Sequence, residues 1–332
     1  MTHAPIVMQA LWRTRGTYFW SLFRRKAGIR AYYEPLHAGL ASNTDEKWAN
    51  DFNYGGMRCL RHPRVDGHYF REYPLLPEGG VAGFDRSMSF GNFMLSEKDE
   101  DPALASYLAS LVDYATQHGQ QAFFKFVRGG LRAAYIRRVL GGTQIYLNRP
   151  PSEIQKSFSS FGPTSYFAAT LAYLVIRYAD RPFCAAALEF LRGLGPFDDA
   201  GMRDWIGDDP VAAQRIAARL TPIQSELLVA TFWLAYLLEG LAIADVVIDT
   251  ERLGCDAEHR TSVGVRLVAL QDQNVFADYQ SSPCADDLLR YAPALRVIVA
   301  ADDRLNALSH AIPPWAVDSL GDASRRLLDA IL

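Results

Sequence analysis

The chain has 332 residues, of which 49% are hydrophobic and 21% are charged, and its formal net charge is −3 at pH 7. This composition is typical of a globular protein with a large core and unlike that of disordered or fibrous chains. The slightly acidic balance gives no overall attraction to nucleic acid, so we expect no nucleic-acid partner. The four cysteines are far apart, which favours neither a disulfide framework nor a cysteine metal site and predicts a cytoplasmic location.

The first predicted elements form a strand, a basic turn and a helix. A buried strand is predicted at residues 6–11, a polar turn at 12–17 and an amphipathic helix at 18–26. Such an arrangement favours anions, because the N-terminus of a helix offers unpaired N–H groups and the positive end of the helix dipole. The turn lacks the glycine and lysine pattern of a Walker A loop, which removes the main support for a nucleoside triphosphate with Mg²⁺.

A long stretch with little periodicity follows a second predicted strand at residues 28–33. Residues 41–101 are rich in Gly, Pro, Asn and aromatic residues, and we interpret them as a lid or acceptor-binding insertion within a single domain of residues 1–332. The basic side chains in this region either contact an anionic acceptor or form a solvated loop; they are Arg58, Arg61, His62 and Arg64.

The middle of the chain alternates strands with helices. A helix is predicted at residues 103–118, a strand at 121–127, a basic helix at 131–140 and a strand at 143–147. This alternation is typical of βαβ units, so the expected fold class is α/β with an open parallel sheet flanked by helices. Arg149 ends the last of these strands, and two prolines then begin a helix that carries Ser157.

The second half of the chain is expected to be rich in helices. Helices are predicted at residues 166–179, 182–194, 210–218 and 222–240, a strand at 244–249, and further helices within 286–332. The longest apolar run, residues 227–238, contains Thr231 and ends before Glu239. We therefore expect a buried helix there and no transmembrane segment.

Two of these segments together resemble the sulfotransferases that use 3′-phosphoadenosine 5′-phosphosulfate (PAPS). Residues 13–17, Arg-Thr-Arg-Gly-Thr, are similar to that family's 5′-phosphosulfate loop, although Arg15 stands where glycine is usual and Gly16 where the first threonine is usual. The spacing of Arg149 and Ser157 resembles the family's 3′-phosphate segment, with Pro150 in place of its usual Asp or Asn.

The resemblance is closest to the carbohydrate sulfotransferases of the GlcNAc-6-O type. The run Glu34-Pro35-Leu36-His37 is similar to their E-P-L-W-H stretch without the Trp, and the sequence from Lys125 to Arg128 resembles their K-x-V-R stretch. The resemblance covers residues 6–37 and 121–160. It implies a P-loop-like sheet and transfer of a sulfuryl group from PAPS to a hydroxyl of a carbohydrate or glycolipid. It also implies that 3′-phosphoadenosine 5′-phosphate (PAP) is the product and that no metal is required.

The resemblance also implies roles for individual residues. The PAPS-binding residues would be Arg13, Thr14, Arg15, Gly16, Thr17, Tyr18, Arg149 and Ser157. Arg13 would also stabilise charge on the leaving oxygen, but an arginine stays cationic and should not donate a proton. Glu34 is the candidate general base at a strand end, and His37 is its rival. Independently of the resemblance, Lys125 and Arg128 lie at another strand end, a position from which they would contact the acceptor or the sulfonate. With Glu34 and His37 they are the candidate substrate-binding residues.

Two other classes of protein remain open at this stage. A phosphoryl-transfer kinase of similar architecture would need a loop lysine and Mg²⁺ ligands. A non-catalytic nucleotide- or anion-binding module would keep the loops without turnover. A tyrosine or a small metabolite also remains open as the acceptor, as does a homo-oligomeric assembly.

Overall fold

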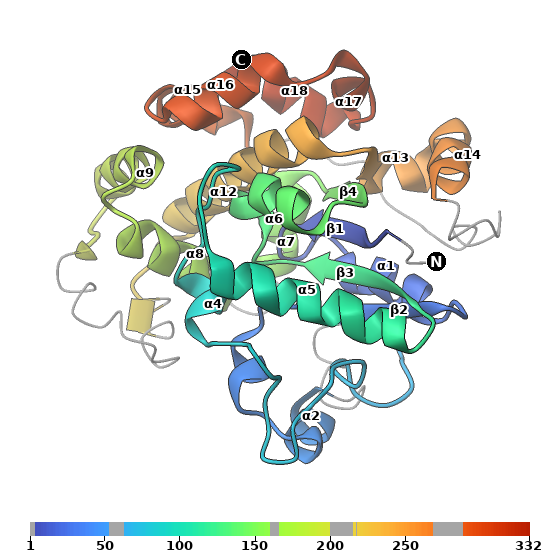
Figure 1. Ribbon diagram of the computed structural model, residues 1–332. Coiled ribbons are helices and arrows are strands. Elements are labelled where there is room, and N and C mark those ends of the chain that lie inside the picture. The colour runs from blue at the N-terminus through green and yellow to red at the C-terminus, as the bar shows by residue number, and fades with distance from the viewer. Residues whose placement is uncertain (1–3, 53–62, 160–165, 200–214, 217, 268–287) are drawn as a thin grey trace.

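The computed structural model describes residues 4–52, 63–159, 166–199, 215–216, 218–267 and 288–332 (Figure 1). Its centre is a five-stranded sheet with the order β2-β3-β1-β4-β5, in which every neighbouring pair is parallel. The strands are β1 (Ile6–Ala10), β2 (Ile29–Tyr33), β3 (Gln121–Phe126), β4 (Thr143–Asn148) and β5 (Val246–Asp249). The prediction of an α/β fold with a parallel sheet flanked by helices is therefore confirmed.

Helices cover both faces of the sheet, which explains why its strands are almost continuously buried. Helix α1 (Gly16–Arg24) packs on β2 and β3, where the ring of Phe23 stacks on Phe123 with centroids 4.0 Å apart. Helices α5 (Pro102–Gln117) and α6 (Ala133–Leu140) lie on the opposite face (Figure 1). The predicted basic helix at 131–140 begins as a short 3₁₀ turn, Gly130–Arg132.

Helix α12 (Pro222–Ile243) is the core of the second half of the protein. A capping box formed by Thr221 and Gln224 starts it, and Gly240 lets it approach the ring of Tyr146 on β4. Among the described residues it is the one helix long and apolar enough to cross a membrane. However, 89% of its most apolar window is buried inside the protein, which agrees with the expected buried helix.

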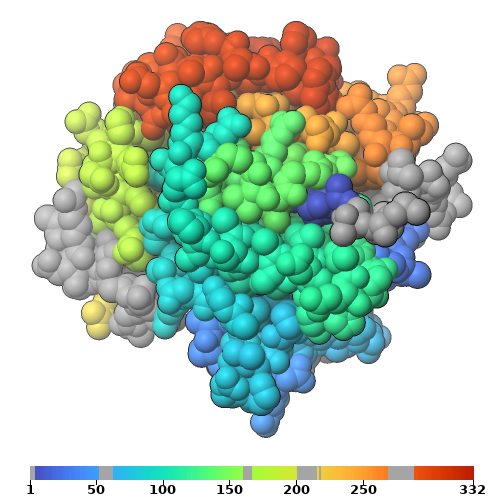
Figure 2. Space-filling model, viewed as in Figure 1, coloured from blue at the N-terminus to red at the C-terminus, as the bar shows by residue number. Residues whose placement is uncertain are grey.

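The remaining helices fall into two groups along the chain. Those in the insertion and after β4 are α2 (Asp45–Phe52), α4 (Ser87–Phe90), α7 (Pro151–Ser159), α8 (Tyr166–Arg177) and α9 (Pro182–Gly193). Those after β5 are α13 (Thr250–Cys255), α14 (Ala257–Arg266), α15 (Ala292–Ala300), α16 (Asp303–Ala311), α17 (Pro314–Asp318) and α18 (Asp322–Ile331). The last four form a layer over α12 at the top of the molecule (Figures 1 and 2). Most of the predicted helix at 210–218 lies outside the described residues.

Candidate functional site

The carboxyl ends of the strands bring the predicted site residues to one edge of the sheet. β1 leads through α1 toward β2 on one side, whereas its neighbour β4 leads to β5 on the other side. In open α/β sheets, ligands bind where the connections diverge in this way. Arg13 follows β1, Glu34 follows β2, Lys125 lies at the end of β3 and Arg149 follows β4.

Backbone strain is concentrated at this edge. Among the described residues, three non-glycine residues have a left-handed φ: Arg13 at 66°, Arg15 at 66° and Glu34 at 46°. Each such conformation costs about 1–2 kcal/mol for a residue with a side chain. Strained residues of this kind cluster at functional sites. All three belong to the residues that the sequence singles out.

The loop after β1 and the segment after β4 meet at Arg13. The Nε of Arg13 donates a hydrogen bond to the Ser157 hydroxyl at 2.8 Å, and Arg149 donates to the backbone oxygen of Arg13 at 2.7 Å. Arg149 also contacts the carboxylate of Glu153, in the first turn of α7, at 3.2 Å. The structure therefore brings the two predicted phosphate segments into direct contact, and it adds an acidic neighbour to one of them.

Glu34 is held by two buried cations. Its Oε1 lies 3.1 Å from the Lys125 ammonium, and its Oε2 accepts a hydrogen bond from Arg128. The side chain of Lys125 is 3% exposed, that of Arg128 is 6% exposed and that of Glu34 is 12% exposed. The N–H of Glu34 donates to the Lys125 carbonyl, which extends the pairing of β2 with β3 by one residue. Three of the four predicted substrate-binding residues therefore form one compact cluster.

The electrostatics of this cluster favour the ionised carboxylate. Burial alone would raise the pKa of Glu34, but the charges of Lys125 and Arg128 outweigh it and hold that pKa well below its ordinary value. Burial lowers the pKa of Lys125, and Glu34 opposes that shift. In this arrangement Glu34 is a weak base, because protonating it would break two buried ion pairs.

In His37, the ring nitrogen that would accept a proton is already occupied. Its Nδ1 accepts a hydrogen bond from the N–H of Gly39 at 3.1 Å, so the neutral ring carries its proton on Nε2. Burial, and then Arg128, lower the pKa of His37 to about 3. The ring packs against Trp48 and Phe70 of the 41–101 region. Of the two candidate bases, the geometry favours Glu34.

The first turn of α1 already satisfies one of the N–H groups that a helix N-terminus is expected to leave unpaired. The N–H of Tyr18 donates to the Arg15 carbonyl at 2.9 Å. The Thr14 hydroxyl donates to the Leu11 carbonyl at 2.7 Å, and the Thr17 hydroxyl pairs with the Tyr33 hydroxyl at 3.1 Å. The Thr14 hydroxyl would have to leave its partner in order to donate to a phosphate, whereas the Thr17 hydroxyl can donate to one while it accepts from Tyr33.

Gly16 explains how this turn approaches the cluster so closely. A Cβ at position 16 would lie 2.9 Å from the Cε of Lys125 and 3.4 Å from the Cβ of Ala10. The N-terminus of α1 is therefore in contact with the side chain of Lys125. Arg13 is also close enough for its charge to disfavour the charged form of Lys125.

Part of the 41–101 region forms a wall of the site. The Arg128 guanidinium lies over the ring of Phe90, 5.1 Å from its centroid. Arg132 is fully buried and donates to the carbonyl oxygens of Met88, Ser89 and Asn92, which holds this segment against the turn after β3. Of the four basic residues predicted in the region, Arg58, Arg61 and His62 lie outside the described residues.

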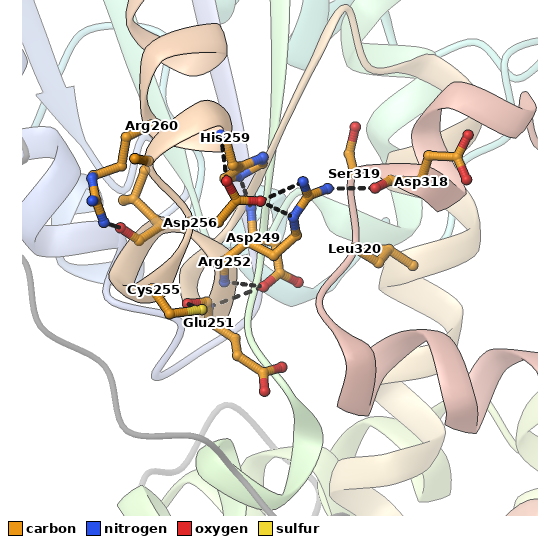
Figure 3. Close-up of polar contacts among 12 residues, drawn as sticks. Asp249, Glu251, Arg252, Cys255, Asp256, His259, Arg260, Asp318, Ser319 and Leu320 are labelled. Carbon is orange, nitrogen blue, oxygen red and sulfur yellow. Dashed lines mark hydrogen bonds and ion pairs between the residues drawn. The ribbon is translucent and has the colours of Figure 1, made fainter.

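A second polar cluster, at the end of β5, has a structural explanation. The buried carboxylate of Asp249 caps α13 by accepting from the N–H groups of Glu251 and Arg252 (Figure 3). It also accepts from the Asn148 amide at 2.7 Å. Burial raises the pKa of Asp249, against these hydrogen bonds. Asp249 is thus an acidic residue at the end of a strand, as a kinase would need, but its oxygens already accept hydrogen bonds from the protein.

Around it, Arg252 bridges Asp256 and the carbonyl of Asp318, which ties α13 and α14 to the C-terminal layer (Figure 3). Among the described residues, no group of three or more His, Cys, Asp or Glu side chains is arranged to hold a metal ion. The site at the carboxyl edge is therefore defined by its cations and by Glu34.

Three residues of the site were not anticipated from the sequence. Tyr33 places its ring 4.3 Å from the Lys125 ammonium, Phe90 covers Arg128, and Glu153 neutralises part of the charge of Arg149. The spacing of Arg149 and Glu153 is a recognisable i, i+4 pair. Nothing local in the sequence indicates the contact of Phe90.

Fold and site together define an α/β protein with a cationic, partly strained candidate site at the carboxyl edge of a parallel sheet. No protein-family model, no curated protein and no solved structure matches the chain. A functional assignment consequently has to rest on the residues of the site itself.

Proposed function

We propose that this protein is a P-loop-like enzyme that transfers the sulfuryl group of PAPS to a hydroxyl acceptor, with a carbohydrate or glycolipid as the expected acceptor. The observation that carries the proposal is the meeting of two arginine-bearing segments at Arg13. The loop after β1 and the segment after β4 touch there through Ser157 and Arg149. A ligand with two separated phosphate groups, such as PAPS, fits two adjacent cationic segments better than a single phosphate does.

The 5′ side of this ligand is assigned to the loop at residues 13–17. Arg15 is left-handed and the helical residue Gly16 follows it, and such a pair turns successive N–H groups toward one concave face that suits an anion. The left-handed φ also gives a physical reason for the glycine that is usual at the position of Arg15 in the resembled family. Arg15 keeps that backbone conformation at some cost in strain.

The 3′ side is assigned to Arg149 and Ser157. Arg149 is 13% exposed and its guanidinium already donates hydrogen bonds to Arg13 and to Glu153. A phosphate would compete with Glu153 for Arg149, so we expect Glu153 to weaken binding of the 3′-phosphate.

The chemistry requires that the acceptor hydroxyl lose a proton and that negative charge on the leaving oxygen be stabilised. Glu34 is the proposed base. Its contact with Lys125 and Arg128 suits this role only if those cations turn to the anionic co-substrate, because the carboxylate then regains basicity. The wall formed by Phe90 and the adjacent residues is the proposed acceptor side.

The same ion pairs favour a second candidate function. A carboxylate neutralised by two buried cations is a poor base, which would suit a module that binds a nucleotide or another anion without turnover. The two functions differ in one property, since the module would bind PAP without transferring sulfate.

The test combines binding and turnover. Thermal unfolding is followed with PAP, with ATP plus Mg²⁺ and with inorganic sulfate, because a ligand bound only by the native state raises the melting temperature. We expect the largest rise with PAP. Transfer of labelled sulfate from PAPS to a panel of carbohydrate, tyrosine and small-molecule acceptors then separates the enzyme from the module. A rise with ATP plus Mg²⁺ and none with PAP would refute the proposal.

A further inference from the structure

The buried cations of the site have more hydrogen-bond donors than the described part of the chain satisfies. An ammonium group carries three N–H donors, and Glu34 is the one acceptor that contacts the Lys125 ammonium among the described residues. The Nε of Arg128 is buried and has no hydrogen-bond partner there. Because unsatisfied buried donors are costly, such a group usually marks a place where a ligand or water binds.

The position of Lys125 places its spare donors beside the proposed phosphate loop. Its Cε lies against Gly16 at the first turn of α1, and its ammonium rests 4.3 Å from the centre of the Tyr33 ring. Tyr33 in turn pairs with Thr17 of the loop. The side chain therefore leaves β3 and reaches the N-terminus of α1, where an anion is favoured by the helix dipole.

We infer that Lys125 contacts the 5′-phosphate at the bond that breaks during sulfuryl transfer. The loop at residues 13–17 contains no lysine that could make this contact. This inference rests on the proposed function and deepens it, because Lys125 then becomes a catalytic residue of the co-substrate side. The sequence alone predicts that Lys125 contacts either the acceptor or the sulfonate.

The step balances without another reactant. The acceptor oxygen forms a bond to sulfur, and the bond from sulfur to the 5′-phosphate oxygen breaks with its electron pair left on that oxygen. Lys125 donates a hydrogen bond to this oxygen and stabilises its negative charge, while Glu34 takes the acceptor proton. When Lys125 turns from Glu34 to the phosphate, Glu34 loses one of its two cations and becomes a stronger base. Binding of the co-substrate thus prepares the base.

The test compares two ligands that differ by one phosphate. Isothermal calorimetry measures the affinity of the wild type and of Lys125→Met for PAP and for adenosine 3′-monophosphate, which lacks the 5′-phosphate. We expect Lys125→Met to weaken PAP binding by about tenfold or more and to leave adenosine 3′-monophosphate within about twofold, because a charged hydrogen bond to one phosphate is lost. Single-turnover transfer from PAPS should slow by about 10²- to 10³-fold.

Lys47→Met serves as the matched control, because Lys47 is an exposed lysine paired with Asp51 on α2 and should bind both ligands as the wild type does. If Lys125→Met does not fold, Glu34→Gln/Lys125→Met removes both charges of that ion pair and is compared with Glu34→Gln, rather than with the wild type, for the same ligands. Equal losses for both ligands would indicate a purely structural role and overturn the inference, as would unchanged PAP binding. A wild type that does not bind PAP would instead overturn the proposed function.

Discussion

Replacing Glu34 with glutamine should separate the structural from the chemical role of the carboxylate. The amide keeps the size of the side chain and one acceptor oxygen, but it removes the negative charge that Lys125 and Arg128 share. The proposed base is lost at the same time. We therefore expect a folded, less stable protein that binds PAP and does not transfer sulfate.

The size of the effect follows from burial. Breaking a buried ion pair by removing one partner costs about 3–5 kcal/mol, and the retained oxygen favours the lower end, about 3 kcal/mol. For 332 residues the entropy of unfolding is about 0.7 kcal/mol per kelvin, so the melting temperature should fall by about 4 °C. A phosphate can then take the place of the missing carboxylate. If PAP binds about tenfold more tightly, it restores about 1.4 kcal/mol, or about 2 °C, beyond its effect on the wild type.

The assay is thermal unfolding of wild type and Glu34→Gln at pH 7 with and without PAP, followed by calorimetry and sulfate transfer. The pKa of the native Glu34 carboxyl is lowered by its two cations, so its stabilisation is present above the ordinary carboxyl pKa and is lost as the pH falls. The difference between the two proteins should therefore shrink below about pH 4. An unchanged melting temperature, or weaker PAP binding by the variant, would refute this account of the cluster.

Three further predictions concern other parts of the structure. Arg149→Ala should weaken PAP binding by about 2–3 kcal/mol. Glu153→Gln should strengthen PAP binding by about threefold, because the substitution removes a partly exposed ion pair with Arg149. Unchanged PAP affinity in both variants, measured by calorimetry, would exclude a phosphate at this position. Arg15→Gly should keep both PAP affinity and stability, because glycine accepts the φ of 66° at this position. Arg15→Val should lower both. A higher melting temperature for the valine variant than for the glycine variant would contradict the role of the backbone. Burial raises the pKa of Glu239 to about 7 against the opposing charge of Arg304, so the native state favours the protonated carboxyl. The free energy of unfolding should therefore fall by about 3 kcal/mol from about pH 4.5 to pH 7. Denaturant unfolding of Glu239→Gln should show a smaller fall over this range, and a pH dependence identical to that of the wild type would count against this prediction.

Much of the architecture follows from local pattern. All five strands were predicted within about two residues, because short apolar runs bounded by turn residues are typical of buried strands. The helix start at Gly16 was placed two residues late, because a basic turn without a capping side chain gives no clear N-terminal signal. The split of the helix after β3 into a 3₁₀ turn and α6 was likewise not visible in the periodicity.

The candidate site could be predicted only as separate pieces. The sequence indicated that Arg13, Glu34, Lys125 and Arg149 each lie near a strand end, and periodicity was sufficient for that. It did not indicate that Glu34 would be neutralised, since Lys125 and Arg128 lie 91 and 94 residues further along the chain. Ion pairs over such separations depend on which strands become neighbours.

By itself, therefore, the sequence determined the elements, their parallel arrangement and the residue types at the carboxyl edge, because periodicity and turn chemistry act over a few residues. The strand order was decided only in the tertiary structure. Placing β3 between β2 and β1 puts Lys125 beside both Glu34 and the first turn of α1, and placing β4 beside β1 joins Arg149 to Arg13. These contacts arise because helices pack on both faces and bury the strands in one register, which no local segment specifies.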